Sequence, residues 1–168
     1  MKRIAIALMM IVALVTPALA TPMSEAIHED RSMTAIHEAG HAIVAESLGA
    51  RVVKVSIIPD YEQGYAGITL YAAPENLSKI SSAAIAYAGM LAQIIYKQNQ
   101  EALGETFIST DEDFRNGASS DLAAIEKLGL SPEEKKQAKM TSLNILKARW
   151  VDVRILAVKL LAKGKVEW

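Results

Sequence analysis

The apolar residues of this chain recur at two different spacings, which together predict a mostly helical protein with a small sheet. A helix is expected from about Ser32 to Leu48, where Gly49, a residue type that commonly follows a helix, ends the apolar pattern. Residues 52–58 are rich in β-branched side chains and predict a strand, and residues 67–71 predict a second strand. A turn separates these strands, so we expect a small antiparallel pair.

The second half of the chain is expected to be helical. The Ala- and Ile-rich segment 77–97 is hydrophobic on most sides, which is typical of a buried helix. A short helix is expected to begin at Asp121. Residues 131–134 (SPEE) form a capping box with proline at the first helical position, and one long helix is expected from there to about Lys163. Its apolar stripe, at 4-3-4-3 spacing, predicts core packing. The stripe consists of Leu146, Trp150, Val153, Ala157 and Leu160.

The N-terminus has the pattern of an export signal. Lys2 and Arg3 precede an apolar run over 4–15, and residues 18–20 (ALA) are typical of a cleavage site. The run of about 12 apolar residues is shorter than the roughly 20 that a helix needs to cross a bilayer. We therefore expect a signal peptide at 1–20 and an exported protein, periplasmic or secreted. A membrane-tethering, uncleaved N-terminus is the alternative.

Length and composition narrow the classes of function. The 168 residues allow one ordinary domain, expected at 32–168 after a flexible segment at 21–31. Loss of residues 1–20 would change the formal charge from −1 to −3, and no basic patch stands out, so nucleic acid is not an expected partner. The chain has no cysteine, which excludes disulfides and thiolate chemistry. It has no G-x-x-x-x-G-K-[ST] motif, so ATP is not an expected partner either.

One segment carries recognisable chemistry: residues 37–41 (HEAGH) match the pattern H-E-x-x-H. Residues four apart on a helix lie on the same face, so His37 and His41 can reach one metal ion. Nitrogen ligands suit Zn²⁺, and a peptidase site keeps one coordination position open for water. Glu38, beside the ligands, can accept a proton from that water. The pattern predicts a zinc hydrolase.

A third protein ligand must come from elsewhere in the chain. The remaining histidine, His28, lies in the unpatterned N-terminal segment. Glu46 follows His41 by five residues, about 140° around the helix, so it should point away from the metal. The acids at 111–113 lie in a polar stretch and stay open as candidates. Asp121 follows a Gly-Ala-Ser-Ser turn and could be held rigidly, although an acid there also suits the helix dipole.

Further segments follow HEAGH in the order in which one known family has them. They are VKVSIIP at 53–59, GITL at 67–70, AGMLAQ at 88–93, GASSDL at 117–122 and the helix at 146–161. Together they resemble the protease domain of the FtsH-type ATP-dependent zinc proteases, over about residues 32–163. The resemblance implies an FtsH peptidase-domain-like zincin fold, helical with a small sheet.

The resemblance also implies roles for individual residues. His37 and His41 would bind zinc, Glu38 would be the catalytic acid and base, and Asp121 would be the third ligand. The expected activity is a zinc-dependent, ATP-independent endopeptidase that hydrolyses peptides or unfolded polypeptides.

The second predicted strand is a candidate substrate site. An extended peptide could pair with its edge by β-addition and present its carbonyl to the metal. An ordinary edge strand is the equally weighted alternative. The residues expected to contact substrate are Gly67, Ile68, Thr69 and Leu70.

The chain also departs from the family. Met90, Gln93 and Ile94 stand where the family normally has an arginine and two glutamates, and the segment after Asp121 is much shorter. These departures leave open whether the chain forms a homo-oligomer. They also support an alternative function, a catalytically weak zinc-binding interaction or regulatory module. The intact Glu38 favours the enzyme, because a structural zinc site needs no base beside its ligands.

Overall fold

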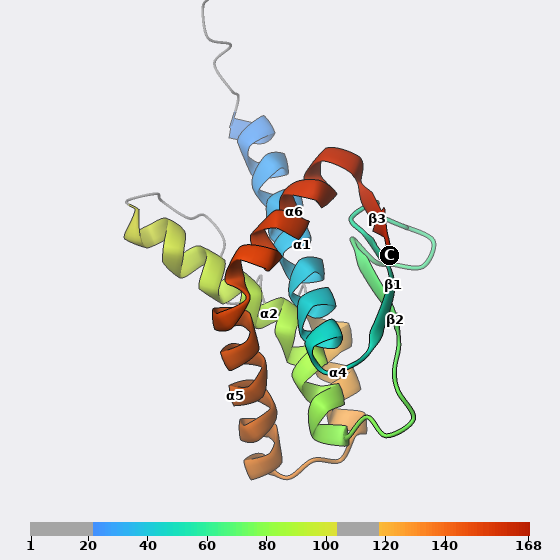
Figure 1. The fold of residues 1–168 in the computed structure, drawn as a ribbon. Helices are drawn as coiled ribbons and strands as arrows, with labels where there is room; N and C mark the ends of the chain where they lie inside the picture. The colour runs from blue at the N-terminus through green and yellow to red at the C-terminus, as the bar shows by residue number, and fades with distance from the viewer. Residues whose placement is uncertain (1–21, 104–117) are drawn as a thin grey trace, which may run out of the picture.

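The computed structural model describes residues 22–103 and 118–168, with side chains from residue 30 onward. Within these ranges the chain forms five helices and a three-stranded antiparallel sheet (Figure 1). The prediction of a mostly helical protein with a small antiparallel sheet is thus confirmed. The expected signal peptide at 1–20 and the candidate acids Asp111, Glu112 and Asp113 lie outside the described residues. None of the helices in the described ranges combines the length and hydrophobicity needed to span a membrane.

The described elements are five helices and three strands. The helices are α1 (Pro22–Ser47), α2 (Lys79–Ala102), α4 (Ser119–Lys127), α5 (Pro132–Ala148) and α6 (Trp150–Lys163). The strands are β1 (Arg51–Ser56), β2 (Ile68–Ala72) and β3 (Lys165–Glu167), in the sheet order β2-β1-β3. The two predicted strands and their antiparallel pairing are confirmed. The third strand, β3, was not predicted; it pairs with the free edge of β1, so β1 is the central strand and β2 remains at one edge of the sheet.

The core is built around α1, which packs against α2, α6 and the sheet (Figure 1). Small residues let α1 and α2 approach closely. A methyl group added at Gly40 would lie 2.7 Å from the Ala92 Cβ and 2.8 Å from the Ala88 carbonyl oxygen. These distances are shorter than van der Waals contact, so glycine is what permits this helix crossing.

The first helix begins earlier than its apolar pattern indicated. The segment expected to be irregular, 21–31, is helical from Pro22 onward, so the predicted start at Ser32 was wrong. Proline suits the first turn of a helix because its missing N–H group would have no partner there. Apolar periodicity marks only the part of a helix that packs, so its absence at the N-terminal end carried no information about the backbone.

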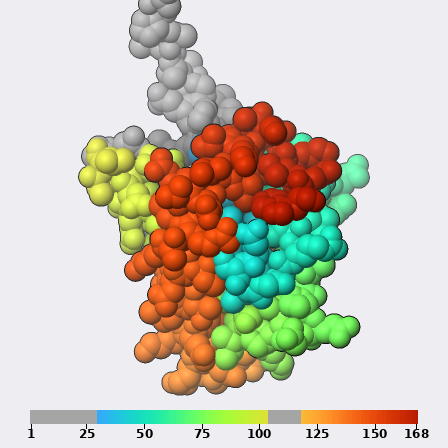
Figure 2. Space-filling view, in the orientation of Figure 1, coloured from blue at the N-terminus to red at the C-terminus, as the bar shows by residue number. Residues whose placement is uncertain are grey.

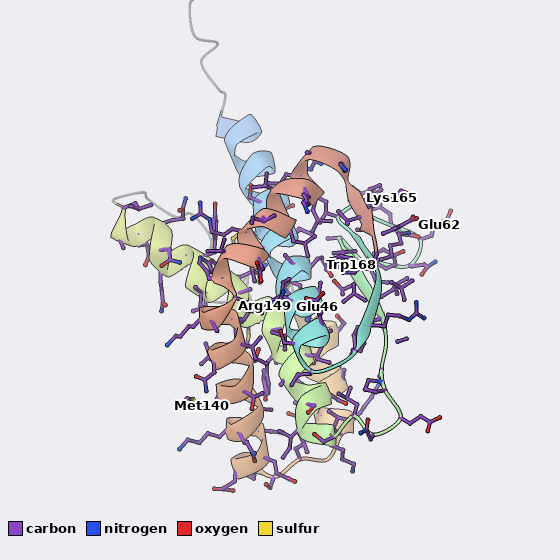
Figure 3. All side chains as sticks on the ribbon, viewed as in Figure 1. Glu46, Glu62, Met140, Arg149, Lys165 and Trp168 are labelled. Atoms are coloured by element: carbon purple, nitrogen blue, oxygen red, sulfur yellow. The ribbon has the colours of Figure 1, made fainter. Side chains whose placement is uncertain are left out.

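The predicted long helix from Pro132 to Lys163 is two helices, broken at Arg149, whose φ of −113° and ψ of 25° are not helical. The guanidinium group of Arg149 donates to Asp152 and, on α1, to Glu46, both at 2.7 Å (Figure 3). The break lets α5 pack on α2 while α6 packs on α1. These two helices, orange to red, cover much of the face in Figure 2.

The apolar stripe and the capping box of this region are both confirmed. Leu146, Val153 and Leu160 are fully buried despite the break between the two helices. The Ser131 side chain accepts from the Glu134 backbone N–H, and the Glu134 carboxylate accepts from the Ser131 N–H.

Candidate metal centre

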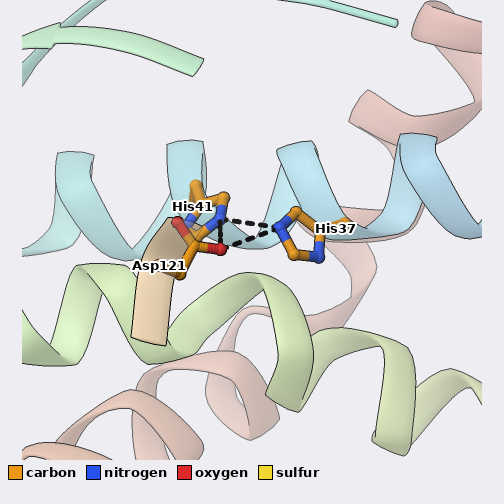
Figure 4. A group of neighbouring side chains, drawn as sticks. All are labelled: His37, His41 and Asp121. Atoms are coloured by element: carbon orange, nitrogen blue, oxygen red, sulfur yellow. Dashed lines mark hydrogen bonds and ion pairs between the residues drawn. The ribbon is translucent and has the colours of Figure 1, made fainter. Parts of the chain in front are cut away.

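Three side chains predicted as metal ligands meet at one point. His37 and His41 lie on successive turns of α1, each only 8% exposed, and Asp121 comes from the first turn of α4. The two Nε2 atoms are 3.0 Å apart. Oδ2 of Asp121 lies 3.1 Å from Nε2 of His37 and 3.2 Å from Nε2 of His41 (Figure 4). The group could hold a metal ion.

The triangle of donor atoms has the size that zinc requires. Zinc bonds of 2.0–2.1 Å in tetrahedral geometry place two ligand atoms about 3.3 Å apart. The observed separations of 3.0–3.2 Å are close to this value. Two imidazoles and one carboxylate also leave a fourth position free, as catalytic zinc sites do.

Hydrogen bonds on the far side of each ring decide which nitrogen faces the centre. Nδ1 of His41 lies 2.8 Å from the Ile85 carbonyl oxygen, which can only accept, so Nδ1 carries the proton. Nδ1 of His37 lies 3.2 Å from Oε1 of Gln93. The Gln93 amide donates in turn to the Met33 carbonyl oxygen at 3.2 Å, which orients Oε1 toward the ring. In the neutral rings both Nε2 lone pairs therefore point at the centre.

The centre thus gathers three acceptors and attracts positive charge. Burial on its own lowers the pKa of His41, but the hydrogen bond and charge of Asp121, with the charge of Glu38, outweigh it and raise that pKa to about 9. Burial on its own raises the pKa of Asp121, but hydrogen bonds and charges from His37 and His41 outweigh it and hold that pKa well below its usual range. Either a proton or a metal cation can be shared by these three acceptor atoms. Two imidazole nitrogens and one carboxylate oxygen are also a donor set that zinc takes.

A glycine on α2 leaves the space in front of the ligands open. A Cβ atom at Gly89 would lie 2.5 Å from both Nε2 atoms. Ile85, Gly89 and Gln93 follow each other at intervals of four, so they form one face of α2 against the two histidines. The sequence analysis missed this face and counted Gln93 only as a departure from the family. The available signal was a glycine and an amide four residues apart in an apolar helix.

The predicted base, Glu38, is almost fully enclosed, at 6% exposed. Its Oε2 accepts a hydrogen bond from the Thr69 hydroxyl at 2.8 Å. Gly67 also lies close to the Glu38 side chain, because a Cβ atom added at Gly67 would lie 2.8 Å from both Cγ and Oε1 of Glu38. The negative charge of Glu38 contributes to the raised pKa of His41, so the carboxylate lies within electrostatic reach of the ligands.

The predicted substrate strand lies beside this carboxylate. Gly67 immediately precedes β2, and Ile68, Thr69 and Leu70 open it at the edge of the sheet. Thr69 reaches inward to Glu38, whereas Leu70 is exposed. Tyr71 lies two residues beyond Thr69, on the same face of the strand. Burial and then the charge of Asp121 raise the pKa of Tyr71, so this residue also lies in the field of the site.

The acid excluded as a ligand, Glu46, has another partner. Glu46 is paired with Arg149 at 2.7 Å, which confirms that it points away from the two histidines. Asp121 does lie in the first turn of α4, the position that suits the helix dipole, but its carboxylate is also directed at both imidazoles. The two interpretations of Asp121 are therefore compatible.

Comparison with known proteins adds nothing to this description. No protein-family model matches the chain, and no curated protein shows significant similarity to it. The interpretation of the site accordingly depends on the residues and distances given above.

Proposed function

We propose that this protein is a zinc-dependent, ATP-independent endopeptidase of the FtsH type, acting on peptides or unfolded polypeptides. One observation carries the proposal: the acceptor atoms of two buried histidines and of a partly buried aspartate, each within 3.2 Å of the other two, converge beside an enclosed glutamate. Such a group of acceptor atoms is stable only with a proton or a cation among them, and two imidazoles with one carboxylate are a donor set that zinc takes.

Zinc would be held by His37, His41 and Asp121. When bound there, zinc supplies a Lewis acid that polarises the scissile carbonyl and lowers the pKa of water toward neutrality. The Ile85 carbonyl and the Gln93 amide keep both Nε2 lone pairs directed at the metal position. These partners also raise the basicity of the ligands, as is usual for the outer contacts of metal-binding histidines.

Glu38 moves the proton. As the water oxygen bonds to the scissile carbonyl carbon, Glu38 takes a proton from that water. As the carbon–nitrogen bond breaks, Glu38 gives the proton to the leaving amine, so the side chain ends the cycle ionised. Its low exposure favours the reaction, because a base shielded from solvent exchanges its proton with the substrate rather than with bulk water.

The edge of β2 suggests the form of substrate. A peptide in extended conformation could form backbone hydrogen bonds along this edge and bring its carbonyl next to Glu38. A flexible or unfolded chain can adopt that pairing most easily, because most strands of a folded protein are already paired. The sequence has no phosphate-binding loop, which is consistent with a reaction that does not use ATP.

The zinc-loaded protein should cleave a flexible substrate such as casein. Glu38→Gln should lower kcat by about 10²–10⁴-fold, because the proton acceptor is lost, while the variant still binds one zinc ion. Glu46→Gln is the matched control: it changes an acid on the same helix that pairs with Arg149, and it should keep wild-type activity.

The outcomes separate the candidate functions. Wild-type activity in Glu38→Gln would remove this residue from the mechanism. Zinc binding without hydrolysis of casein or of a mixed peptide library would favour the alternative, a catalytically weak zinc-binding interaction module. Failure to bind zinc at all would refute the metal centre.

A further inference from the structure

The strand at the edge of the sheet contacts the proposed base through a single side chain. The Thr69 hydroxyl lies 2.8 Å from Oε2 of Glu38 and 3.0 Å from the backbone carbonyl oxygen of the same residue. β2 follows α1 by more than twenty residues and meets it here at the centre of the site. The hydroxyl therefore lies within hydrogen-bond distance of both the carboxylate and the backbone carbonyl of Glu38.

The hydroxyl has one proton to donate, and the carboxylate is the better acceptor. An ionised oxygen forms shorter and stronger hydrogen bonds than a neutral carbonyl, in line with the two distances. Threonine is also stiff about χ1, because its Cβ is branched, so the position of the hydroxyl is set by the backbone of β2. A glutamate has three rotatable bonds, and this contact restricts where its carboxylate can lie.

The packing around the Glu38 carboxylate also indicates that its position is restricted. Gly67, two residues before Thr69, leaves room for the Glu38 side chain where any larger residue would collide with it. Thr34, one turn before Glu38 on α1, also lies next to Gly67 but donates its own hydroxyl to the Asp30 carbonyl. Thr69 thus makes the contact to the carboxylate, while Thr34 makes none that is directed at it.

We propose that Thr69 is a positioning residue that holds the Glu38 carboxylate in the orientation needed for proton transfer. The strand proposed to bind substrate then also sets the geometry of the base. This inference rests on the proposed function, and it predicts that the Thr69 hydroxyl affects the chemical step rather than the binding of zinc or substrate.

Thr69→Val keeps the shape of the side chain and removes the hydroxyl. It should lower kcat on casein-derived peptides by about tenfold or more, because a misplaced base loses rate steeply, while KM and zinc affinity change less than about twofold. Thr69→Ser should restore kcat to within about threefold of wild type, since the hydroxyl returns. Thr34→Val is the matched control and should leave kcat unchanged, because its hydroxyl does not face Glu38.

A second measurement does not depend on turnover. Acetohydroxamate binds metal and releases its proton to a neighbouring base, so its affinity for the zinc-loaded protein reports on the Glu38 carboxylate. Thr69→Val should weaken acetohydroxamate binding by about tenfold, and Thr69→Ser should not.

The result that overturns the inference is a Thr69→Val variant with wild-type kcat and acetohydroxamate affinity, or a Thr69→Ser variant as impaired as the valine one. Either result leaves the proposed function intact, because that function is judged by wild-type activity and by Glu38→Gln. If the wild type binds zinc but cleaves nothing, the proposed function fails, and the acetohydroxamate series alone decides the role of Thr69.

Discussion

Two polar clusters join distant parts of this chain, and they are built in opposite ways. Around Arg149, one cationic group donates to the acceptors Glu46, Asp152 and Ser47. Between α1 and α4, two imidazoles and the Asp121 carboxylate turn acceptor atoms toward each other. The Arg149, Glu46 and Asp152 side chains are 34%, 42% and 47% exposed, whereas both histidines are nearly buried.

This difference in charge and exposure distinguishes an ion-pair cluster that links helices from a candidate metal site. In the Arg149 cluster a cation faces carboxylates, so opposite charges are already paired, and ion pairs at such exposure contribute only about 0–1 kcal/mol to stability. The histidine cluster needs a proton or a metal cation among its three inward-facing atoms, and the hydrogen bonds to Ile85 and Gln93 hold the rings in that orientation. Groups whose pKa values are strongly shifted by a defined partner in an enclosed position are typical of functional sites.

Filling the space next to the two histidine Nε2 atoms should cause the largest loss of zinc affinity. Gly89→Ala would put a methyl group 2.5 Å from both Nε2 atoms. Since the methyl group must displace the rings or occupy the metal position, zinc affinity should fall more than about hundredfold. Isothermal titration with a competing chelator measures this.

Gly40→Ala is the matched glycine variant. It adds the same methyl group against Ala92 and Ala88, so it should lower the free energy of unfolding by about 1–3 kcal/mol through overpacking. The zinc affinity of its folded form should fall less than that of Gly89→Ala, because this methyl group meets Ala88 and Ala92 and not the Nε2 atoms. If Gly89→Ala bound zinc as the wild type does, the metal would not lie between these Nε2 atoms.

The pH dependence of zinc affinity tests the raised pKa of His41, about 9. Below that pH the metal-free site carries a proton on His41, and zinc must displace it. Affinity should therefore rise with pH by about tenfold per unit, or about a hundredfold between pH 6 and pH 8, and level off near pH 9. Release of about one proton per zinc, measured by titration in buffers of different ionisation enthalpy, is the direct check. A flat profile would contradict the site as described.

Removing Gln93, the hydrogen-bond partner of His37 Nδ1, should change zinc affinity less than Gly89→Ala or the change in pH does. Gln93→Leu deletes the acceptor for Nδ1 and the donor to the Met33 carbonyl, so the ring is less well oriented. Zinc affinity should fall by about tenfold, the lower end of the range for such contacts. The ¹⁵N shifts of the imidazole should show that the Nδ1–H tautomer of His37 is no longer dominant.

A variant in the other cluster sharpens the contrast. Arg149→Met should lower stability by about 1 kcal/mol and leave zinc affinity unchanged. An equal loss of affinity in Gln93→Leu and Arg149→Met would mean that both act through general destabilisation.

The parts of the fold that local pattern could predict are those in which neighbours in sequence interact. The capping box at Ser131 depends on residues three apart, and the strands at β1 and β2 follow from β-branched residues. The break at Arg149 could not be predicted in this way, because its partners Glu46 and Ser47 are about a hundred residues away. The strand β3 has only three residues, too few to form a pattern.

The sequence by itself determined the chemistry and spacing of His37, Glu38 and His41, because the period of the helix alone puts two imidazoles on one face. Only the tertiary structure decided that Asp121 meets both of them, that both Nε2 atoms face inward, and that Thr69 contacts Glu38. These contacts depend on how α2 packs against both α1 and α4 and on where β2 crosses α1. Helical periodicity reports on residues a few positions apart, whereas His41 and Asp121 are 80 residues apart and meet only when the core is packed.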